Sequence, residues 1–256
     1  MVFFGTGKFL EEDDRTSTDS QYVFGIWDFG DDTDNSEYPG TFIEGGTPQL
    51  SNLNQNIQLL EQTAIFGGYI LGDYLRVLSN NTPDWTVACD ATAGQDPDPD
   101  PTIHSPKTTG ANAGWYFKLP IAGERIIKDV IVRDNKLIYI TFTPDTSPCS
   151  GGGNSIVHVV DACSGGRLTS AQFDNSKDRL IDSKDLIDIG LVDGNGNAIL
   201  VAPTGIRKSG MLHNPVFIGF ADRPVELMIF SSSGGTTEEM PKLAEPMGMF
   251  YWRNNQ

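Results

Sequence analysis

Hydrophobic residues along the chain occur in short runs that alternate with polar or glycine-rich segments. The runs are rich in β-branched and aromatic residues, a composition typical of β-strands. Tight-turn sequences such as Asp134-Asn135 and Asp193-Gly194 lie between them. The pattern predicts about a dozen short strands, the clearest of which cover residues 2–4, 21–28, 115–119, 125–132, 136–143, 155–161, 215–220 and 226–231, together with the run 191–201, which contains the Asp193-Gly194 turn.

Helical spacing of apolar residues occurs in one segment, residues 52–78. Steps of three and four residues separate its apolar positions: Leu53, Ile57, Leu60 and Ala64. Gly67 and Gly68 then interrupt the pattern, because glycine weakens a helix interior. We therefore expect at most one helix in this segment and an all-β fold elsewhere.

The 256 residues allow one large all-β domain or two small ones, with 28 glycines and 15 prolines dividing the elements. Evenly spaced short strands fit a sandwich or a propeller. Residues 156–168 favour the propeller, because an apolar strand, Asp161, small residues and Gly165 form a pattern typical of quinoprotein-like blades. A dozen strands make roughly three blades. We expect a single, partial β-propeller domain over residues 1–256, as part of a longer chain whose upstream blades, or a second copy, cover the open edge.

Two polar segments interrupt this pattern. Residues 90–113 contain Asp96-Pro97-Asp98-Pro99-Asp100-Pro101 and are expected to form a flexible loop insertion. Residues 11–37 hold ten acidic residues and one basic residue, which is typical of a solvated loop. The alternative for this second segment is another metal site, formed by Asp28, Asp31, Asp32 and Asp34.

The formal net charge is −16, from 34 acidic and 18 basic residues. This excess argues against nucleic acid as a partner, since such binding depends on Lys and Arg at phosphates. It suits divalent cations and an extracellular setting. No apolar stretch approaches the roughly 20 residues of a membrane span, and we recognise no signal peptide at the start.

The most specific chemical signal is an acidic loop, residues 174–185. Oxygen donors fall at positions 1, 3, 5, 7, 9 and 12 of an EF-hand-type calcium loop, with a main-chain carbonyl at position 7. The candidate ligands are Asp174, Ser176, Asp178, Leu180 through its carbonyl, Asp182 and Asp185. Alternate residues of a tightly curled loop can all face one ion, and calcium prefers roughly six to eight hard oxygens. Ile181 is the expected apolar plug that ties the loop to a core.

Three features depart from the usual loop. Arg179 stands where a glycine normally makes the sharp turn, Ser176 replaces a carboxylate or amide, and Asp185 is shorter than the usual glutamate. Residues 174–182 are therefore expected to hold the ion, with Asp185 outside the first ring of ligands. The affinity is expected to be modest, on the order of 10⁻⁴–10⁻³ M. The alternative is a solvated acidic turn without metal.

Cysteine and histidine add little chemistry. Cys149 and Cys163 flank a predicted strand, and a disulfide between them is one option; pairs with Cys89 and buried free thiols are the others. The three histidines, His104, His158 and His213, are scattered, and His158 is expected to be an ordinary strand residue. We find no hydrolase, zinc-protease or P-loop motif and expect no enzymatic activity.

Several segments carry a more specific signal in collinear order: Phe4-Gly5-Thr6-Gly7-Lys8-Phe9-Leu10, Tyr22-Val23-Phe24-Gly25-Ile26-Trp27-Asp28, Gly114-Trp115-Tyr116-Phe117-Lys118-Leu119-Pro120, Gly123-Glu124-Arg125, Thr141-Phe142-Thr143-Pro144 and Tyr251-Trp252-Arg253. These segments resemble signatures of the PilY family of type IV pilus tip proteins. The resemblance covers nearly the whole chain, and the acidic loop falls where the family has its calcium site.

The resemblance implies a C-terminal propeller with one surface calcium whose occupancy regulates pilus extension and retraction, with a role in adhesion. It implies pilins or minor pilins as partners, together with a host or abiotic surface. It also implies secretion through the periplasm to the pilus tip or the outer-membrane surface. The chain has no Arg-Gly-Asp tripeptide, which leaves integrin binding by that route unsupported. Two other functions stay open: a quinone-dependent oxidoreductase, which quinone absorbance would reveal, and an adhesion propeller with purely structural calcium.

Overall fold

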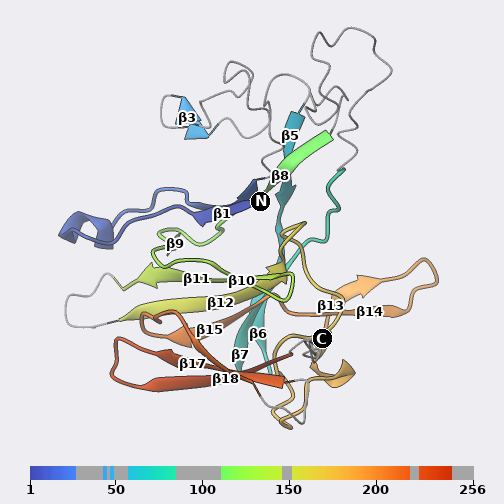
Figure 1. Cartoon of the computed structure of the whole chain (residues 1–256). Coiled ribbons are helices and arrows are strands. Elements are labelled where there is room, and N and C mark those ends of the chain that lie inside the picture. The colour runs from blue at the N-terminus through green and yellow to red at the C-terminus, as the bar shows by residue number, and fades with distance from the viewer. Residues whose placement is uncertain are drawn as a thin grey trace, which may run out of the picture.

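The structure is a computed structural model of residues 1–256, shown in Figure 1. It describes residues 1–26, 43–44, 47–48, 57–84, 111–145, 152–219 and 225–243. These residues form eighteen strands and two short 3₁₀ turns, η1 (Glu12–Arg15) and η2 (Ser183–Asp185). The predicted all-β class is confirmed. No helix in the described part is long and apolar enough to cross a membrane.

The first sheet has the strand order β1-β2-β8-β5. Its strands are β1 (Val2–Gly5), β2 (Tyr22–Ile26), β8 (Ala111–Lys118) and β5 (Ile57–Gln62). β8 pairs antiparallel with β2 and parallel with β5, so residues far apart in the sequence meet in this sheet. A short hairpin of β3 (Ile43–Glu44) and β4 (Thr47–Pro48) forms a separate pair.

The second sheet has seven strands in the order β10-β11-β12-β15-β7-β6, with β9 paired to β11. The strands are β10 (Ile131–Arg133), β11 (Lys136–Pro144), β12 (Gly153–Asp161), β15 (Gly205–Ser209), β7 (Asp73–Leu78), β6 (Ala64–Ile70) and β9 (Arg125–Ile126). Asp134 and Asn135 both have φ near +55° (54° and 57°), which makes the tight turn that their sequence predicts between β10 and β11.

Two smaller units complete the described fold. β16 (Val216–Gly219), β17 (Val225–Ser231) and β18 (Thr237–Leu243) form a three-stranded antiparallel sheet. β13 (Ile187–Val192) and β14 (Ala198–Val201) form a hairpin that projects to the right of the body in Figure 1. Its turn is the predicted Asp193–Gly196 segment, where Asp193 accepts hydrogen bonds from Asn195 and Asn197.

The seven-stranded sheet is a central layer with a hydrophobic cluster on each face. Leu137 and Tyr139 of β11 pack with Trp115 and Phe117 of the first sheet. The alternate residues Ile138 and Ile140 pack on the other face, in a cluster that includes Met228 and Phe230 of β17. Because both faces are covered, β11 is apolar along most of its length rather than alternating.

Trp115 connects the first two sheets. Its indole is fully buried, and Nε1 donates to the carbonyl of Ala162 at 3.0 Å. Gly165, at φ +69°, passes so close to the indole that a Cβ there would overlap it. The Asp161–Gly165 pattern that we identified in the sequence is therefore a turn shaped to receive this tryptophan.

Three expectations need correction or comment. Residues 57–78 of the predicted helical segment form strands β5, β6 and β7, so the helix prediction is wrong for them. The insertion expected at residues 90–113 lies outside the described residues except for its end, where 111–113 belong to β8. The described sheets do not close into a propeller.

Of the options left open for the cysteines, a disulfide between Cys149 and Cys163 is not present, because Cys163 is a free thiol, and an exposed one. Cys89 and Cys149 lie outside the described residues.

Four residues lie in a row across the face of the central sheet that is turned toward the first sheet. Tyr139, His158, Gly205 and Arg76 stand in register on four adjacent strands. Arg76 extends past the glycine to pair with the carboxylate of Glu124 through two hydrogen bonds of 2.6 and 3.0 Å. A Cβ on Gly205 would clash with the His158 ring, so glycine leaves the room that this row requires.

The ion pair between Arg76 and Glu124 is buried, with both side chains at most 1% exposed. Thr141 donates a further hydrogen bond to Glu124. Removing one partner leaves an uncompensated buried charge. We therefore expect Arg76→Met to lower the free energy of unfolding by about 3–5 kcal/mol, measured by urea denaturation. Arg76→Met combined with Glu124→Gln removes both charges and should recover most of the loss; a double variant as unstable as the single one would contradict this explanation.

His158 is fully buried and stacks on Tyr139 at 4.5 Å between ring centroids, as expected for a packed strand residue. Burial, and then the Arg76 charge, hold the pKa of His158 well below its usual value of 6.5. As the pH falls below 6.5, the unfolded chain binds a proton that the folded chain does not. The contribution of neutral His158 to stability is therefore fully present above pH 6.5. Below it, the free energy of unfolding falls by roughly 1 kcal/mol per pH unit.

We expect the wild type to lose more stability between pH 7.5 and pH 5 than His158→Phe or His158→Gln. Other groups that titrate in this range, the carboxylates above all, are shared by all three proteins. Urea denaturation at both pH values provides the measurement. Equal losses in the wild type and in both variants would show that His158 does not carry this dependence.

Candidate metal centre

The acidic loop, residues 174–185, begins and ends at the hydrophobic core. Phe173, which precedes it, is 1% exposed and forms a β-bridge with Lys242 of β18. Ile187, just after it, begins β13 and packs in the same hydrophobic cluster as Phe173. The scaffold thus fixes the position of both ends of the loop.

Asp174 organises the first half of the loop. Its Oδ1 accepts from the N–H of Asp178 at 3.2 Å, and its Oδ2 accepts from the N–H of Arg179 at 2.8 Å. The Ser176 hydroxyl lies 3.4 Å from Asp174 Oδ1 and also within hydrogen-bonding reach of the Asp178 side chain. The structure therefore brings together Asp174, Ser176 and Asp178, three of the predicted ligands.

The loop makes its sharp turn without the usual glycine. Arg179 has φ +69° and Lys177 has φ +63°, both in the left-handed region that favours glycine. A side chain in this conformation costs on the order of 1 kcal/mol. The two main-chain hydrogen bonds to Asp174 offset this cost by holding the turn.

Asp185 joins the two halves of the loop through the hydrogen bonds of its buried carboxylate. It is fully buried, and its two carboxylate oxygens accept from the N–H groups of Ser176 and Asp182, both at 2.9 Å. The Asn175 side chain donates to the Asp185 carbonyl at 2.7 Å. Because main-chain donors engage both carboxylate oxygens, this arrangement is consistent with a place for Asp185 outside the first ring of ligands.

The remaining predicted positions lie nearer to solvent. Asp182 is exposed and caps η2, where its Oδ1 accepts from the N–H of Lys184 at 2.7 Å. Leu180 has a side chain that is 57% exposed, and its N–H donates to Asp178. Ile181, expected to be an apolar plug, is half-buried.

Asp178 is the most strongly held of the exposed carboxylates. The hydrogen bond from Leu180, followed by the Lys184 ammonium, holds the pKa of Asp178 below its usual value. The ion pair joins Lys184 Nζ to Asp178 Oδ2 at 3.2 Å. The same contact raises the pKa of Lys184. Spacing alone does not indicate this pair, because position 11 of such a loop carries no ligand.

The donor chemistry of the loop fits calcium. Within the described ranges, no three His, Cys, Asp or Glu side chains form a group that would hold a metal ion by themselves. The loop instead combines carboxylates with a hydroxyl and main-chain carbonyls, all of them hard oxygens of the kind that calcium prefers. Asp174, Ser176 and Asp178 are adjacent, Leu180 contacts Asp178 through its N–H, and Asp182 lies further along the loop as the cap of η2.

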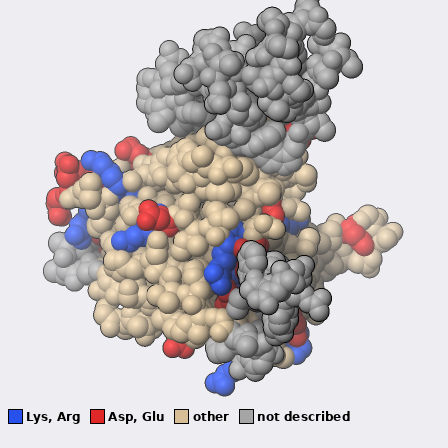
Figure 2. All heavy atoms as spheres, in the orientation of Figure 1, with Lys and Arg blue, Asp and Glu red and all other residues tan. Residues whose placement is uncertain are grey.

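Other candidates can be placed more briefly. The alternative site at Asp28, Asp31, Asp32 and Asp34, and also His104, lie outside the described residues. His213 is exposed, whereas His158 is buried beside Arg76. The charged groups seen in Figure 2 are scattered in small groups of both signs. One ion pair near the N-terminus joins Lys8 Nζ to Asp14 Oδ1 of η1 at 3.3 Å.

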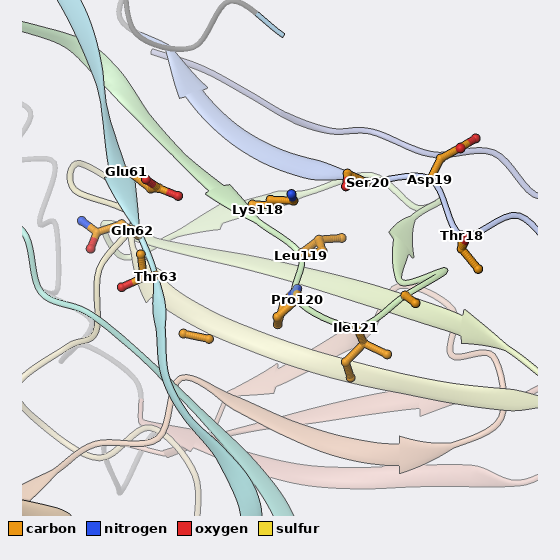
Figure 3. A pocket seen from close by; sticks show the side chains of 12 residues that line it. Thr18, Asp19, Ser20, Glu61, Gln62, Thr63, Lys118, Leu119, Pro120 and Ile121 are labelled. Carbon is orange, nitrogen blue, oxygen red and sulfur yellow. The ribbon is translucent and has the colours of Figure 1, made fainter. Parts of the chain in front are cut away.

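A pocket of about 410 Å³ opens beyond the ends of β5 and β8, away from the acidic loop. Figure 3 shows Glu61, Lys118 and Ser20 on one side of it and Ile121 on the other. Three segments that are far apart in the sequence form this pocket, so residue spacing does not reveal it. The hydroxyls, carboxylates and ammonium of its lining suit a polar ligand.

The chain was compared with known proteins. No protein-family model matches it. It is 26% identical over 217 residues to the type IV pilus biogenesis factor PilY1 of Pseudomonas aeruginosa strain PAO1. The matched region spans 82% of this chain and 16% of that protein. A "Type IV pilus biogenesis factor PilY1 homolog" from Xylella fastidiosa is 27% identical over 247 residues, or 91% of this chain and 15% of that one.

This chain is homologous to PilY1. The fold agrees, because the crystal structure of the P. aeruginosa PilY1 C-terminal domain superposes with a TM-score of 0.59. That match covers 96% of this chain and 42% of the crystallised PilY1 chain, at 23% sequence identity. The resemblance to the PilY family found in the sequence is confirmed. The chain spans about one sixth of the length of the curated PilY1 relatives, 15–16% in the two above.

The contacts of Asp185 generate a prediction that does not involve metal. Asp185→Asn replaces one acceptor oxygen by an amide that meets a main-chain N–H. We expect the variant to lose about 1–3 kcal/mol of stability, measured by urea denaturation in EDTA. Asp188→Asn is the control, at an exposed position on β13 where the carboxylate accepts one solvent-exposed hydrogen bond from the N–H of Gly190, and it should change stability less. Equal losses in the two variants would show that Asp185 does not brace the loop.

Proposed function

We propose that this chain is part of a type IV pilus biogenesis factor whose acidic loop binds calcium, and that the occupancy of this loop regulates pilus extension and retraction. Homology to PilY1 over 82–91% of the chain is the observation that carries the pilus assignment. The hydrogen bonds that join Asp174, Ser176 and Asp178 carry the metal assignment.

In this proposal Asp174, Ser176, Asp178 and Asp182 hold the ion with their side chains and Leu180 with its carbonyl, while Asp185 braces the loop from outside. Bound calcium supplies positive charge that neutralises these carboxylates. Without it, the aspartates rely on main-chain N–H groups and on Lys184. The residues of the loop therefore have two alternative sets of partners.

The projecting hairpin is the element that such a switch would affect. η2 ends the loop at Asp185, and β13 begins two residues later. Several of the hairpin's apolar side chains are at least one third exposed: Leu191, Val192, Ile199 and Leu200. When the loop becomes more or less ordered, the exposed apolar hairpin that follows it would be affected directly.

The proposed setting follows from the relatives. The parent protein would be secreted through the periplasm to the pilus tip or outer-membrane surface, where pilins or minor pilins and a host or abiotic surface are its partners. The described sheets would be part of a β-propeller that the rest of the parent chain completes. The separate, mostly antiparallel sheets, which pack around two hydrophobic clusters, support this arrangement.

A calcium titration tests the metal assignment. Asp178→Ala should weaken calcium binding at least about tenfold, because it removes a carboxylate that contacts the other ligands. It should leave the fold intact, since Asp178 is exposed. Isothermal titration calorimetry with circular dichroism provides the measurement. Asp188→Ala, three residues beyond the loop, is the matched control; an unchanged affinity in Asp178→Ala would overturn the assignment.

Complementation tests the regulatory role. A strain that lacks the parent gene is supplied with the wild type, Asp178→Ala or Asp188→Ala, and surface pili and twitching motility are measured. We expect Asp178→Ala to alter the balance of extension and retraction. Normal piliation and motility in a variant that no longer binds calcium would remove the regulatory role and leave the ion purely structural.

A further inference from the structure

The acidic loop contains almost as many cations as carboxylates. Residues 174–185 include four aspartates and three basic residues, Lys177, Arg179 and Lys184, so that the formal charge of the loop is only −1. The affinity of calcium loops depends on the charge of their ligands. Where the three cations lie therefore decides how much of the negative charge is available to an ion.

The two lysines have different partners. Lys184 Nζ contacts Asp178 Oδ2 at 3.2 Å and so neutralises a carboxylate of the proposed ligand set. Lys177 Nζ contacts Asp73 Oδ2 at 3.0 Å, a residue of β7 outside the loop. Both lysine side chains are largely exposed, 65% for Lys184 and 62% for Lys177. They have the same charge and similar exposure and differ in which carboxylate they contact.

We propose that the Lys184 ammonium is a built-in competitor of calcium, which occupies Asp178 in the metal-free loop and must leave when the ion binds. This inference rests on the proposed calcium site. The ammonium and the ion require the same carboxylate, and Asp178 Oδ1 is already engaged by the N–H of Leu180. Oδ2, the atom that Lys184 contacts, is therefore the oxygen over which the two cations compete.

The competition sets the range of calcium concentration over which the site fills. An exposed ion pair is weak, so Lys184 can be displaced, and calcium gains because a divalent ion interacts with several oxygens at once. Lys184 thus weakens the affinity without abolishing it. Its position within η2, three residues before β13, also means that the exchange moves a positive charge at the base of the projecting hairpin.

The test compares three lysine variants with the wild type by calcium titration calorimetry at constant ionic strength. Lys184→Gln removes the competitor and should tighten calcium binding about threefold to tenfold. Lys177→Gln removes the same charge from the same loop but frees no ligand, so it should change the affinity by less than about twofold. Lys184→Arg keeps a cation and should stay close to the wild type.

The outcomes separate the two proposals. If the wild type binds calcium and Lys184→Gln gains no more affinity than Lys177→Gln, the competitor role is overturned and the calcium site stands. If neither the wild type nor Lys184→Gln binds calcium at millimolar concentration, the proposed calcium site fails, and the competitor role fails with it. A selective gain in Lys184→Gln, together with a calcium-bound crystal structure in which Lys184 has left Asp178, supports both.

Discussion

The buried guanidinium of Arg76 is the constraint around which the central sheet is arranged. A charge inside a β-sheet layer is unfavourable unless a partner of opposite charge and further hydrogen bonds satisfy it. Glu124, on the connection from the first sheet, provides that partner, and Thr141 adds a hydrogen bond. Position 205, which pairs with Arg76, needs glycine because a Cβ there would clash with the side chains of His158 and Ile156. The ion pair therefore ties the central sheet, through Arg76 of β7, to the connection from the first sheet that carries Glu124.

The acidic loop depends on this scaffold for its geometry. Phe173 and Ile187 belong to the cluster on the other face of the same central sheet, and they hold the loop at its two ends. Between them the loop supplies its own order, through the hydrogen bonds of Asp174 and the buried carboxylate of Asp185. In the proposed switch, this fixed base would allow an ion to change the loop and the hairpin without unfolding the core.

Homology and local chemistry contribute different parts of the functional argument. The similarity to PilY1 supports the proposed role in pilus biogenesis but says nothing about which residues act. The contacts of Asp174, Ser176, Asp178 and Lys184 support the proposed cation site and its proposed competitor, but they do not reveal the system in which the site acts. The chain spans about one sixth of the length of these two PilY1 relatives, so the partners and activity of the whole proteins enter only as proposals.

Residue type and spacing by themselves determined the all-β class, most strand positions, the turn at Asp134-Asn135 and the candidate calcium loop, because these depend on neighbours within a few residues. They failed at residues 57–78, where spacing typical of a helix belongs to strands β5 to β7, since pairing with distant β8 and β15 outweighs local preference. The partners of Arg76 and Trp115, the pocket beside β5 and the two different pairings of Lys177 and Lys184 were decided by tertiary structure alone. Each of these contacts joins segments or side chains whose meeting depends on how the sheets pack and the loop curls, and residue order does not encode that directly.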